Sequence, residues 1–335
     1  MRLSLFAPCL LAACAVACAP SADGDKALDD ANPDDSGADT AGEDGASWDP
    51  DATIYENCWS DLRPAEAGFP VYENFGLIPG RHCQGSDHQD ITGVEKLVFL
   101  GDSITAGTPP TPSDEIWRAR FTLSMKARFG EGLEVADCSE FGARTDDYLP
   151  DQLPRCFPGP EPKRTLIVST MGGNDLFSAA SAYTEGRGID AALAVLDRAV
   201  GYQREALRSL RETEAERFPA GLFVITSTVY EFTDTTGDLS SCPLADQLGF
   251  GGQAREVTFA TSYMNAQFAQ VAVETGTDLV FMGEEFCGHG FHGDDPSLPC
   301  YRGPDTPEFF DLTCIHPTSA GHEKLSEMFT AVVDG

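Results

Sequence analysis

Two side chains far apart in the sequence could perform nucleophilic chemistry together. Ser103 follows Gly101 and Asp102 directly after an apolar run, and His316 precedes the last stretch with helical spacing. A serine hydroxyl is a poor nucleophile at its own pKa and needs a neighbouring base such as imidazole to take its proton. The pair indicates acyl transfer to Ser103 with His316 as base. Alone, a Gly-Asp-Ser triplet is weak evidence, because the same residues form turns with a helix-capping serine.

Two further motifs could supply hydrogen-bond donors to such a reaction. Gly142 lies in Gly-Ala-Arg-Thr after the second apolar run, where a backbone N–H could point into the same crevice. Asn174 lies in Gly-Gly-Asn-Asp after the third run and offers a side-chain amide. Each motif is also compatible with a plain turn or helix start. Four motifs in this order, each at the predicted end of a strand or the start of the last helix, are hard to attribute to chance.

These four motifs resemble the SGNH hydrolase superfamily, also called GDSL lipases and esterases, and the resemblance spans about residues 97–328. It implies a flavodoxin-like sandwich with five parallel strands. It also implies that Ser103 is the nucleophile, that His316 is the base, and that an oxyanion hole is formed by the backbone N–H groups of Ser103 and Gly142 and the side-chain amide of Asn174. Donors aimed at the developing oxyanion lower the barrier to acyl transfer.

The sequence departs from the family at the third member of the triad. The family places an aspartate three residues before the histidine, but here that position is Thr313, and the nearest acid is Asp311. Either the main-chain carbonyl of Thr313 orients His316 in a Ser–His dyad, or Asp311 reaches the imidazole through a local rearrangement. We favour the carbonyl, since it needs no rebuilding of the turn.

Three other polar residues near these motifs are expected to be structural. Asp102 and Asp175 each follow a motif residue and are expected to order their turns through hydrogen bonds to backbone N–H groups. His322 falls in the first turn of the last predicted helix and is not expected to be catalytic.

The elements that must position these residues alternate along the chain. Short apolar runs predict five buried strands at Lys96–Leu100, Leu133–Ala136, Thr165–Met171, Leu222–Thr226 and Asp278–Met282. Helical spacing is found between them, at Trp117–Phe129, Ile189–Leu210, Glu256–Glu274 and Ala320–Val332. Strands alternating with helices predict an α/β fold, a three-layer α/β/α sandwich with a five-stranded parallel sheet whose reactive groups gather at the carboxyl ends of the strands.

The amino-terminal region predicts export. Residues 3–17 form an apolar run too short to span a bilayer but typical of a signal peptide, and Cys14 and Cys18 each end a lipobox-like segment. We therefore expect a signal peptide over 1–18, of lipoprotein type, and a disordered acidic linker over 19–52. A hydrolase domain is expected over 53–335, beginning with an irregular extension at 53–94. The protein would be secreted or anchored to a membrane only through lipid.

Beyond Cys18 there are eight cysteines, an even number that indicates disulfides in an exported protein. They are Cys58, Cys83, Cys138, Cys156, Cys242, Cys287, Cys300 and Cys314. Short local loops favour pairing Cys58 with Cys83 and Cys138 with Cys156. A metal site built from Cys287, His289, His292, Asp294 and Asp295 is the weaker hypothesis, because no second cysteine pair stands at finger spacing.

These observations predict a serine-dependent carboxylic ester hydrolase that needs no metal or organic cofactor and acts on acyl esters outside the cytoplasm. Within the same family, an esterase of acetylated carbohydrate is the alternative, and a surface lipoprotein that has lost activity is a third hypothesis. The formal net charge of −32 excludes nucleic acid as a partner, since phosphate binding needs clustered Lys and Arg. We expect a monomer.

Overall fold

The computed structural model describes residues 49, 51–59, 71–249 and 251–335. The predicted signal peptide, its lipidation candidates Cys14 and Cys18, and most of the predicted linker lie outside the described residues. Among the described residues, no helix is both long enough and apolar enough to cross a membrane.

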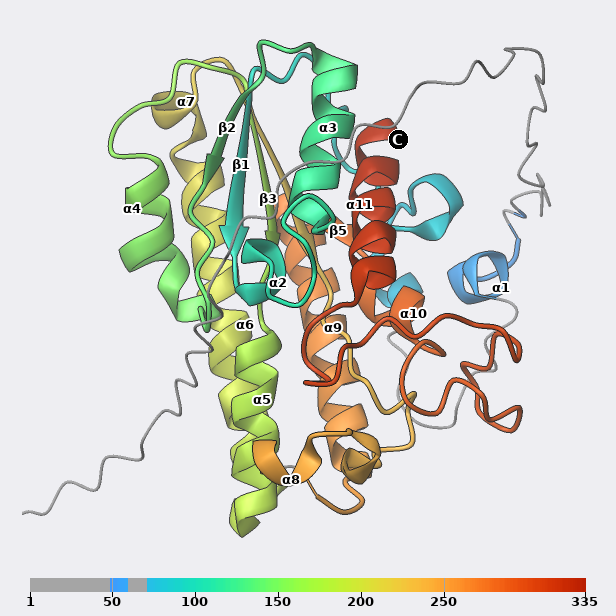
Figure 1. Cartoon of the computed structure of the whole chain (residues 1–335). Helices are drawn as coiled ribbons and strands as arrows, with labels where there is room; N and C mark the ends of the chain where they lie inside the picture. The colour runs from blue at the N-terminus through green and yellow to red at the C-terminus, as the bar shows by residue number, and fades with distance from the viewer. Residues whose placement is uncertain (1–48, 50, 60–70, 250) are drawn as a thin grey trace, which may run out of the picture. The chain divides into compact units, whose positions relative to one another are not determined.

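One sheet of five parallel strands forms the centre of the fold (Figure 1). The strands are β1 (Lys96–Gly101), β2 (Glu134–Asp137), β3 (Thr165–Thr170), β4 (Leu222–Ser227) and β5 (Asp278–Val280). Their order across the sheet is β2-β1-β3-β4-β5, and every pair is parallel. This is the flavodoxin-like order, so the predicted fold class is confirmed.

Helices cover both faces of the sheet (Figure 1). On one face lie α3 (Trp117–Phe129) and α11 (Ser319–Asp334), where Trp117 stacks on Phe329 with ring centroids 4.5 Å apart. The other face carries α5 (Gly173–Ala182), α6 (Ile189–Glu212) and α9 (Arg255–Thr275). The shorter helices are α1 (Ile54–Cys58), α2 (Ser103–Ala106), α4 (Leu153–Cys156), α7 (Glu214–Arg217), α8 (Ala245–Leu248) and α10 (Met282–Phe286).

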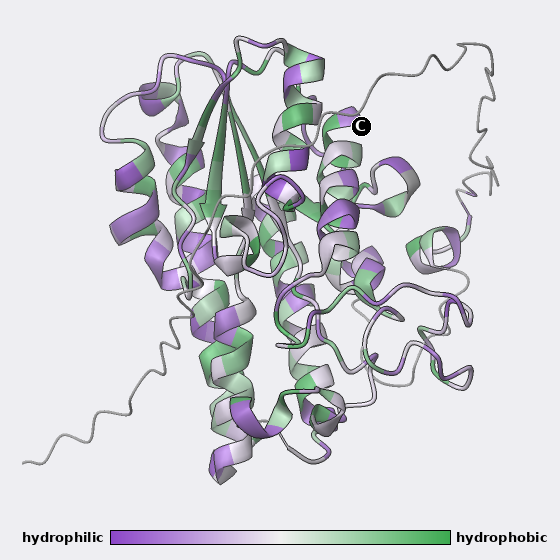
Figure 2. Ribbon diagram, viewed as in Figure 1, coloured by the Kyte–Doolittle hydropathy of each residue, from purple (hydrophilic) through white to green (hydrophobic). Residues whose placement is uncertain are grey.

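The pleat of the strands divides the apolar side chains between two cores. In β1, Leu97 and Phe99 join the cluster under α3 and α11, whereas Val98 and Leu100 join the cluster under α6 and α9. This alternation is what a strand period of two produces when both faces of a sheet are buried. Figure 2 shows the strands as the hydrophobic interior and the outer faces of the helices as more hydrophilic.

β2 differs from the other strands. The sequence predicted five buried strands, but Glu134, Val135 and Asp137 are exposed, so the prediction of burial was wrong for this strand. The reason is its position: β2 is an edge strand that pairs only with β1, and one of its sides faces solvent.

Residues 71–94 cover the opposite edge of the sheet. Ser86 N donates to Leu279 O at 2.9 Å, and Phe281 N donates to Gln84 O at 2.9 Å, so this segment pairs with the exposed side of β5. Trp59, just after α1, packs on Phe281 with ring centroids 5.5 Å apart. Covering an edge strand in this way removes a row of unpaired backbone groups.

The eight cysteines form four disulfides. Cys58 pairs with Cys83 and Cys138 pairs with Cys156, which confirms the two predicted local loops. The sequence left the other pairs open, and they are Cys242 with Cys314 and Cys287 with Cys300. Because the Cys287 sulfur lies in a disulfide, it cannot serve as a thiolate ligand in the weaker metal hypothesis.

Candidate active site

Ser103 lies at the carboxyl end of β1, in a turn that depends on glycine. β1 ends at Gly101, whose φ is +125°, and a Cβ built there would lie 2.3 Å from Thr170 O. Only glycine therefore fits this position. Asp102 caps α2 by accepting a hydrogen bond from Ile104 N, and Ser103 is the first residue of that short helix, with 8% of its surface exposed.

Asp102 orders this turn. Its Oδ1 accepts hydrogen bonds from Ile104 N at 3.0 Å and from Thr170 Oγ1 at 3.1 Å, as expected for a structural residue. Burial raises the pKa of its carboxyl to about 7, and the two hydrogen bonds oppose that rise. Gln152 secures the same turn from the other side, because its amide exchanges two 2.8 Å hydrogen bonds with the backbone of Gly101.

His316 lies beside Ser103, although 213 residues separate them. Its Nε2 is 2.9 Å from Ser103 Oγ, which is hydrogen-bonding distance. Burial lowers the pKa of the imidazole, while the charge of Asp311 acts in the opposite direction. A lowered pKa keeps the ring neutral, and a neutral ring is the form that can accept a proton.

The partner of His316 Nδ1 is neither of the two groups that the sequence suggested. The side-chain hydroxyl of Thr313 lies 3.2 Å from Nδ1, and the same hydroxyl donates to Asp311 Oδ1. The expectations of a Thr313 carbonyl contact and of a direct Asp311 contact are therefore both corrected. The physical reason is local: Asp311 Oδ1 also accepts from Thr313 N at 2.8 Å, which turns the carboxylate toward Thr313 and puts the hydroxyl between acid and ring.

The other two motif residues lie on a turn and on the start of a helix, and a hydrogen bond joins these two segments. Asn174, in the first turn of α5, donates from Nδ2 to Ala143 O at 2.9 Å. Ala143 follows Gly142, which has a φ of +78° and is exposed. Among the described residues, the backbone N–H groups of Gly142 and Ser103 have no hydrogen-bond partner, so both donors are free for a ligand.

The side chain of Asp175 also connects these two segments. Its Oδ2 accepts from Thr145 N at 3.0 Å, and its Oδ1 accepts from Arg144 Nε at 3.3 Å. The residue is 2% exposed, and this burial raises the pKa of its carboxyl against the effect of both contacts. Asp175 therefore has the structural role expected for it, because it joins the segment that follows Gly142 to the start of α5, where Asn174 lies.

His322 is fully buried in the first turn of α11. Burial lowers the pKa of its ring to about 4. Among the described residues neither ring nitrogen has a hydrogen-bond partner, so the ring makes no hydrogen bond to Ser103. These observations agree with the expectation that His322 is not catalytic.

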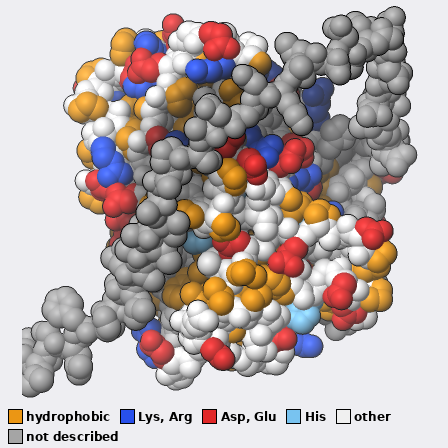
Figure 3. Space-filling view, viewed as in Figure 1, with side chains coloured by type: hydrophobic (Ala, Val, Ile, Leu, Met, Phe, Trp, Pro, Cys, Tyr) orange, Lys and Arg blue, Asp and Glu red, His pale blue; other side chains and the backbone are white. Residues whose placement is uncertain are grey.

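An apolar pocket of about 80 Å³ opens beside Ser103. Its polar boundary includes Asp102, Asn174 and Glu231, and its apolar walls are Ile104, Leu176, Phe177, Ala180, Val229, Tyr230, Phe232, Leu239, Val257 and Ile315. Figure 3 shows hydrophobic side chains gathered over α5 and the loops next to it, on the face seen in Figure 1. A pocket of this kind suits the acyl part of an ester.

The segment that follows β4 supplies much of this pocket, although its role was not predicted from the sequence. Residues 229–239 contribute Val229, Tyr230, Phe232 and Leu239. A signal was present, because a largely apolar Val-Tyr-Glu-Phe sequence begins three residues beyond the carboxyl end of a predicted strand, where ligands of parallel sheets bind.

Parallel strands that carry a serine–histidine contact and an apolar pocket at their carboxyl ends define a hydrolase-like α/β protein. Residues 99–324 match the model of the GDSL-like lipase/acylhydrolase family, and the chain belongs to that family. It is a hydrolase that acts on ester bonds. No curated protein matches the sequence.

Solved structures to which the chain is similar include lipases and an acetyl xylan esterase. A lipase from a goat rumen metagenome is 17% identical, with a TM-score of 0.50, over 71% of this chain and 96% of that chain. An extracellular lipase from Streptomyces rimosus is 21% identical, with a TM-score of 0.47, over 71% and 99%. A variant acetyl xylan esterase from Geobacillus stearothermophilus is 18% identical, with a TM-score of 0.45, over 73% and 97%. At 17% identity, the similarity to the goat rumen lipase supports the fold alone.

Proposed function

We propose that this protein hydrolyses carboxylic esters through an acyl-enzyme, with Ser103 as nucleophile and His316 as general base. The observation that carries the proposal is the 2.9 Å contact between Ser103 Oγ and His316 Nε2, made by a ring whose pKa burial lowers. His316 takes the hydroxyl proton as Ser103 attacks the ester carbonyl, and then gives it to the departing alcohol. Water repeats both steps on the acyl-enzyme.

The oxyanion of each tetrahedral intermediate needs donors, and three are at hand in this proposal. They are the N–H groups of Ser103 and Gly142, both without partners among the described residues, and the second N–H of the Asn174 amide. Fixed donors stabilise the charge that develops in the transition state without reorganising at that moment. The bonds from Asp175 to the loop of Gly142 support such a fixed arrangement.

The pocket beside Ser103 supports an ester with an apolar acyl group. Its walls are almost entirely aliphatic and aromatic, which favours an acyl chain over a hydrated sugar. Its volume of about 80 Å³ accommodates a short acyl chain, and a longer chain would extend out of the pocket. A series of nitrophenyl esters from acetyl to decanoyl, run beside acetylated xylan, tests this: we expect the highest kcat/KM on short nitrophenyl acyl chains. Turnover of acetylated xylan alone would indicate the carbohydrate esterase instead.

A fluorophosphonate probe tests the mechanism itself, because it reacts only with an activated serine. We expect wild-type protein to be labelled at Ser103 and the Ser103→Ala variant not to be labelled. Ser124→Ala is the matched control, since Ser124 lies on α3 away from the pocket and its hydroxyl bonds only to Arg120 O at 3.4 Å. Absence of labelling in folded wild-type protein would sink the proposal and favour a binding protein without activity.

We also infer that the enzyme acts outside the cytoplasm. Four disulfides support an oxidising compartment. Anchoring through Cys14 or Cys18 is tested by metabolic labelling with a fatty acid in the expressing bacterium. Label that is lost in Cys18→Ser or in Cys14→Ser assigns the lipidated residue, and unlabelled protein in the medium indicates secretion.

A further inference from the structure

We propose that the hydroxyl of Thr313 is a positioning residue that links Asp311 to His316, so that acid and base act through a bridging threonine. This inference rests on the proposed function of Ser103 and His316. It deepens that function by assigning the member of the site for which the sequence has no aspartate at the usual position.

The contacts fix the direction of each hydrogen bond. A threonine hydroxyl has one proton, and an ionised carboxylate only accepts. Since the Thr313 hydroxyl bonds to both Asp311 Oδ1 and His316 Nδ1, its proton goes to the carboxylate and its lone pair accepts from Nδ1–H. The ring therefore carries its proton on Nδ1. Nε2 keeps its lone pair for Ser103, from which it is 2.9 Å away.

The loop that carries these residues is held from several sides. Asp311 N donates to His316 O at 2.9 Å, and Cys314 N donates to Asp311 O at 2.8 Å, which closes the loop on itself. The buried hydroxyl of Tyr230 donates to Ile315 O at 2.7 Å. Cys314, with a φ of +63°, is joined to Cys242 by a disulfide. A side chain on such a loop has little freedom to leave its partner.

The bridge also carries charge. When His316 takes the serine proton, it becomes a buried cation, which burial disfavours. The carboxylate of Asp311 offsets this cost through the hydroxyl, because an oxygen that donates to an anion is a stronger acceptor for Nδ1–H. The electrostatic influence of Asp311 on the ring has this sign, since it raises the pKa that burial lowers.

A merely structural role for Asp311 and Thr313 is the competing explanation. Aspartate often accepts from the backbone two residues on, and Asp311 Oδ1 does accept from Thr313 N. In that case the pair would shape the turn, and the negative charge would not matter to the reaction. The substitution Asp311→Asn separates the two explanations, because asparagine keeps the Oδ1 acceptor and removes the charge.

Three variants test the bridge by their kcat, KM and pH profile on a short-chain nitrophenyl ester. Thr313→Val removes the hydroxyl at nearly constant shape, and we expect kcat to fall roughly 100-fold with little change in KM. Asp311→Asn should lower kcat similarly. In both variants the acid limb of kcat/KM should move to lower pH. Asp311→Asn removes the anion that favours the imidazolium, and Thr313→Val removes the hydroxyl that connects that anion to Nδ1–H. Thr313→Ser restores the hydroxyl and should keep kcat within about 5-fold of wild type.

The double variant Thr313→Val with Asp311→Asn completes the test. Residues that act as one unit are not additive, so the double variant should be no slower than the slower single variant. The bridge would be overturned if the kcat losses of the two single variants multiplied in the double variant. It would also be overturned by an acid limb that does not move, or by a Thr313→Ser variant as slow as Thr313→Val. Should Thr313→Val melt far below wild type, Asp311→Asn and Thr313→Ser decide the outcome.

Failure of the bridge and failure of the proposed function give different results. If the bridge is wrong, the wild-type protein is still labelled at Ser103 by a fluorophosphonate and still turns over the ester. If the proposed function is wrong, the wild-type protein itself is not labelled.

Discussion

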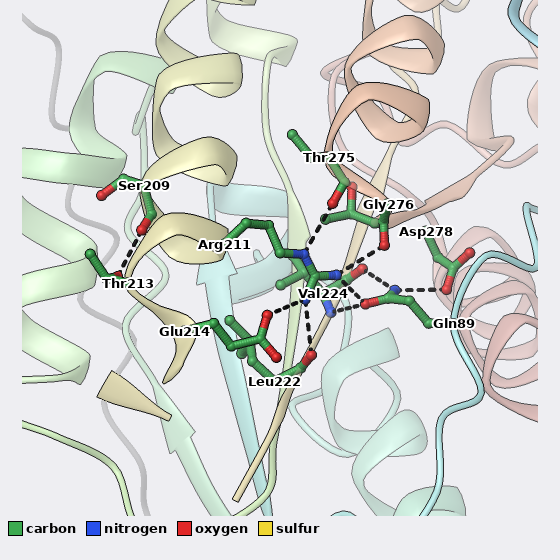
Figure 4. Close-up of polar contacts among 11 residues, drawn as sticks. Gln89, Ser209, Arg211, Thr213, Glu214, Leu222, Val224, Thr275, Gly276 and Asp278 are labelled. Atoms are coloured by element: carbon green, nitrogen blue, oxygen red, sulfur yellow. Dashed lines mark hydrogen bonds and ion pairs between the residues drawn. The ribbon is translucent and has the colours of Figure 1, made fainter. Parts of the chain in front are cut away.

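The two ends of the sheet each hold a dense polar network, and the networks differ in what they leave unpaired. At the amino-terminal ends of β4 and β5, Gln89, Arg211 and Asp278 form the network drawn in Figure 4. The Gln89 amide exchanges two hydrogen bonds with the backbone of Val224, at 2.8 and 3.0 Å, in the place where a neighbouring strand would bond. It also donates to Asp278 Oδ2 at 2.7 Å.

Arg211 completes that network and uses its whole guanidinium. It donates to the carbonyls of Leu222, Thr275 and Gly276, at 2.9 to 3.1 Å, and to the side chains of Gln89 and Glu214. The carbonyl of Thr275, the last residue of α9, and that of its C-cap Gly276 thereby gain a donor that the helix itself cannot supply. Each N–H group of the Arg211 guanidinium therefore has a protein acceptor.

The carboxyl end of the sheet is different, because two of its backbone donors are unpaired in the described part of the chain. The backbone N–H groups of Ser103 and Gly142 have no partner within the described part of the chain, and they lie on loops that Asp102 and Asp175 hold in place. A satisfied network stabilises the fold, whereas rigid unsatisfied donors beside a pocket are suited to bind a developing charge. Substitutions at the carboxyl end should therefore lower the catalytic rate, and substitutions at the amino end should lower the free energy of unfolding.

The largest effect is expected from the nucleophile. Ser103→Ala should lower kcat/KM for a nitrophenyl ester roughly 10⁵-fold or more, because it removes the hydroxyl that hydrogen-bonds to His316 Nε2. The melting temperature should stay within a few degrees of wild type. A variant that retained a tenth of the activity would show that the catalytic end has another nucleophile.

The next effect is expected at the oxyanion hole. Asn174→Ala removes a side-chain donor and should lower kcat roughly 100- to 1,000-fold, equivalent to about 3 to 4 kcal/mol of transition-state stabilisation. KM should change little, since the donor acts on charge that develops only during the reaction. Labelling by a fluorophosphonate should be slow but should still occur at Ser103. A loss of less than 5-fold would remove Asn174 from the hole.

At the opposite end of the sheet we expect the reverse pattern. Arg211→Met leaves the carbonyls of Leu222, Thr275 and Gly276 without their donor and should lower the free energy of unfolding by about 3 kcal/mol. The kcat of the folded variant should equal that of wild type. Urea unfolding followed by fluorescence measures the first quantity, and initial rates well below the midpoint measure the second.

Arg208→Met is the matched control for this variant. Arg208 lies one turn earlier on α6, is 55% exposed and makes an ion pair with Glu274 at 3.0 Å. An exposed pair contributes little, so the change should stay within about 0.5 kcal/mol. Equal losses in the two variants would contradict the view that the Arg211 network, and not arginine on α6 in general, stabilises this end.

The sequence predicted the positions of the strands better than the details of the site. Runs such as Leu97–Leu100 are apolar because both faces of a parallel sheet are buried, and the structure has strands within a few residues of all five predictions. The short helix α5 was not predicted, since its small residues give little helical periodicity. β2 was predicted to be buried because its edge position depends on strand order, which a local apolar run does not contain.

The wrong prediction at Thr313 has the same cause, since it also depended on local sequence alone. The family pattern led to its carbonyl or to Asp311, because sequence spacing alone places residues three apart near one another. Which atom of Thr313 meets His316 depends on a loop bent by Cys314 and held by Tyr230, which is 85 residues away from the carbonyl that it contacts. Contacts between distant segments thus set the direction of the Thr313 side chain, and the local sequence does not predict them.

The smallest effect that we predict concerns pH, and it sharpens the contrast between the two ends. Only neutral His316 can accept the serine proton, and burial lowers its pKa from the ordinary 6.5. As pH falls, the ring should stay neutral past 6.5, so the acid limb of kcat/KM should have its midpoint below that value. Titration of the His316 ring by NMR, assigned with His316→Gln, separates it from His289 and His322, whose pKa values are both lowered to about 4. A midpoint at or above 6.5 would mean that the charge of Asp311 outweighs burial at this ring. The charge that His316 gains in the reaction would then be paired with Asp311, as the charge of Arg211 is paired with Glu214 at the other end.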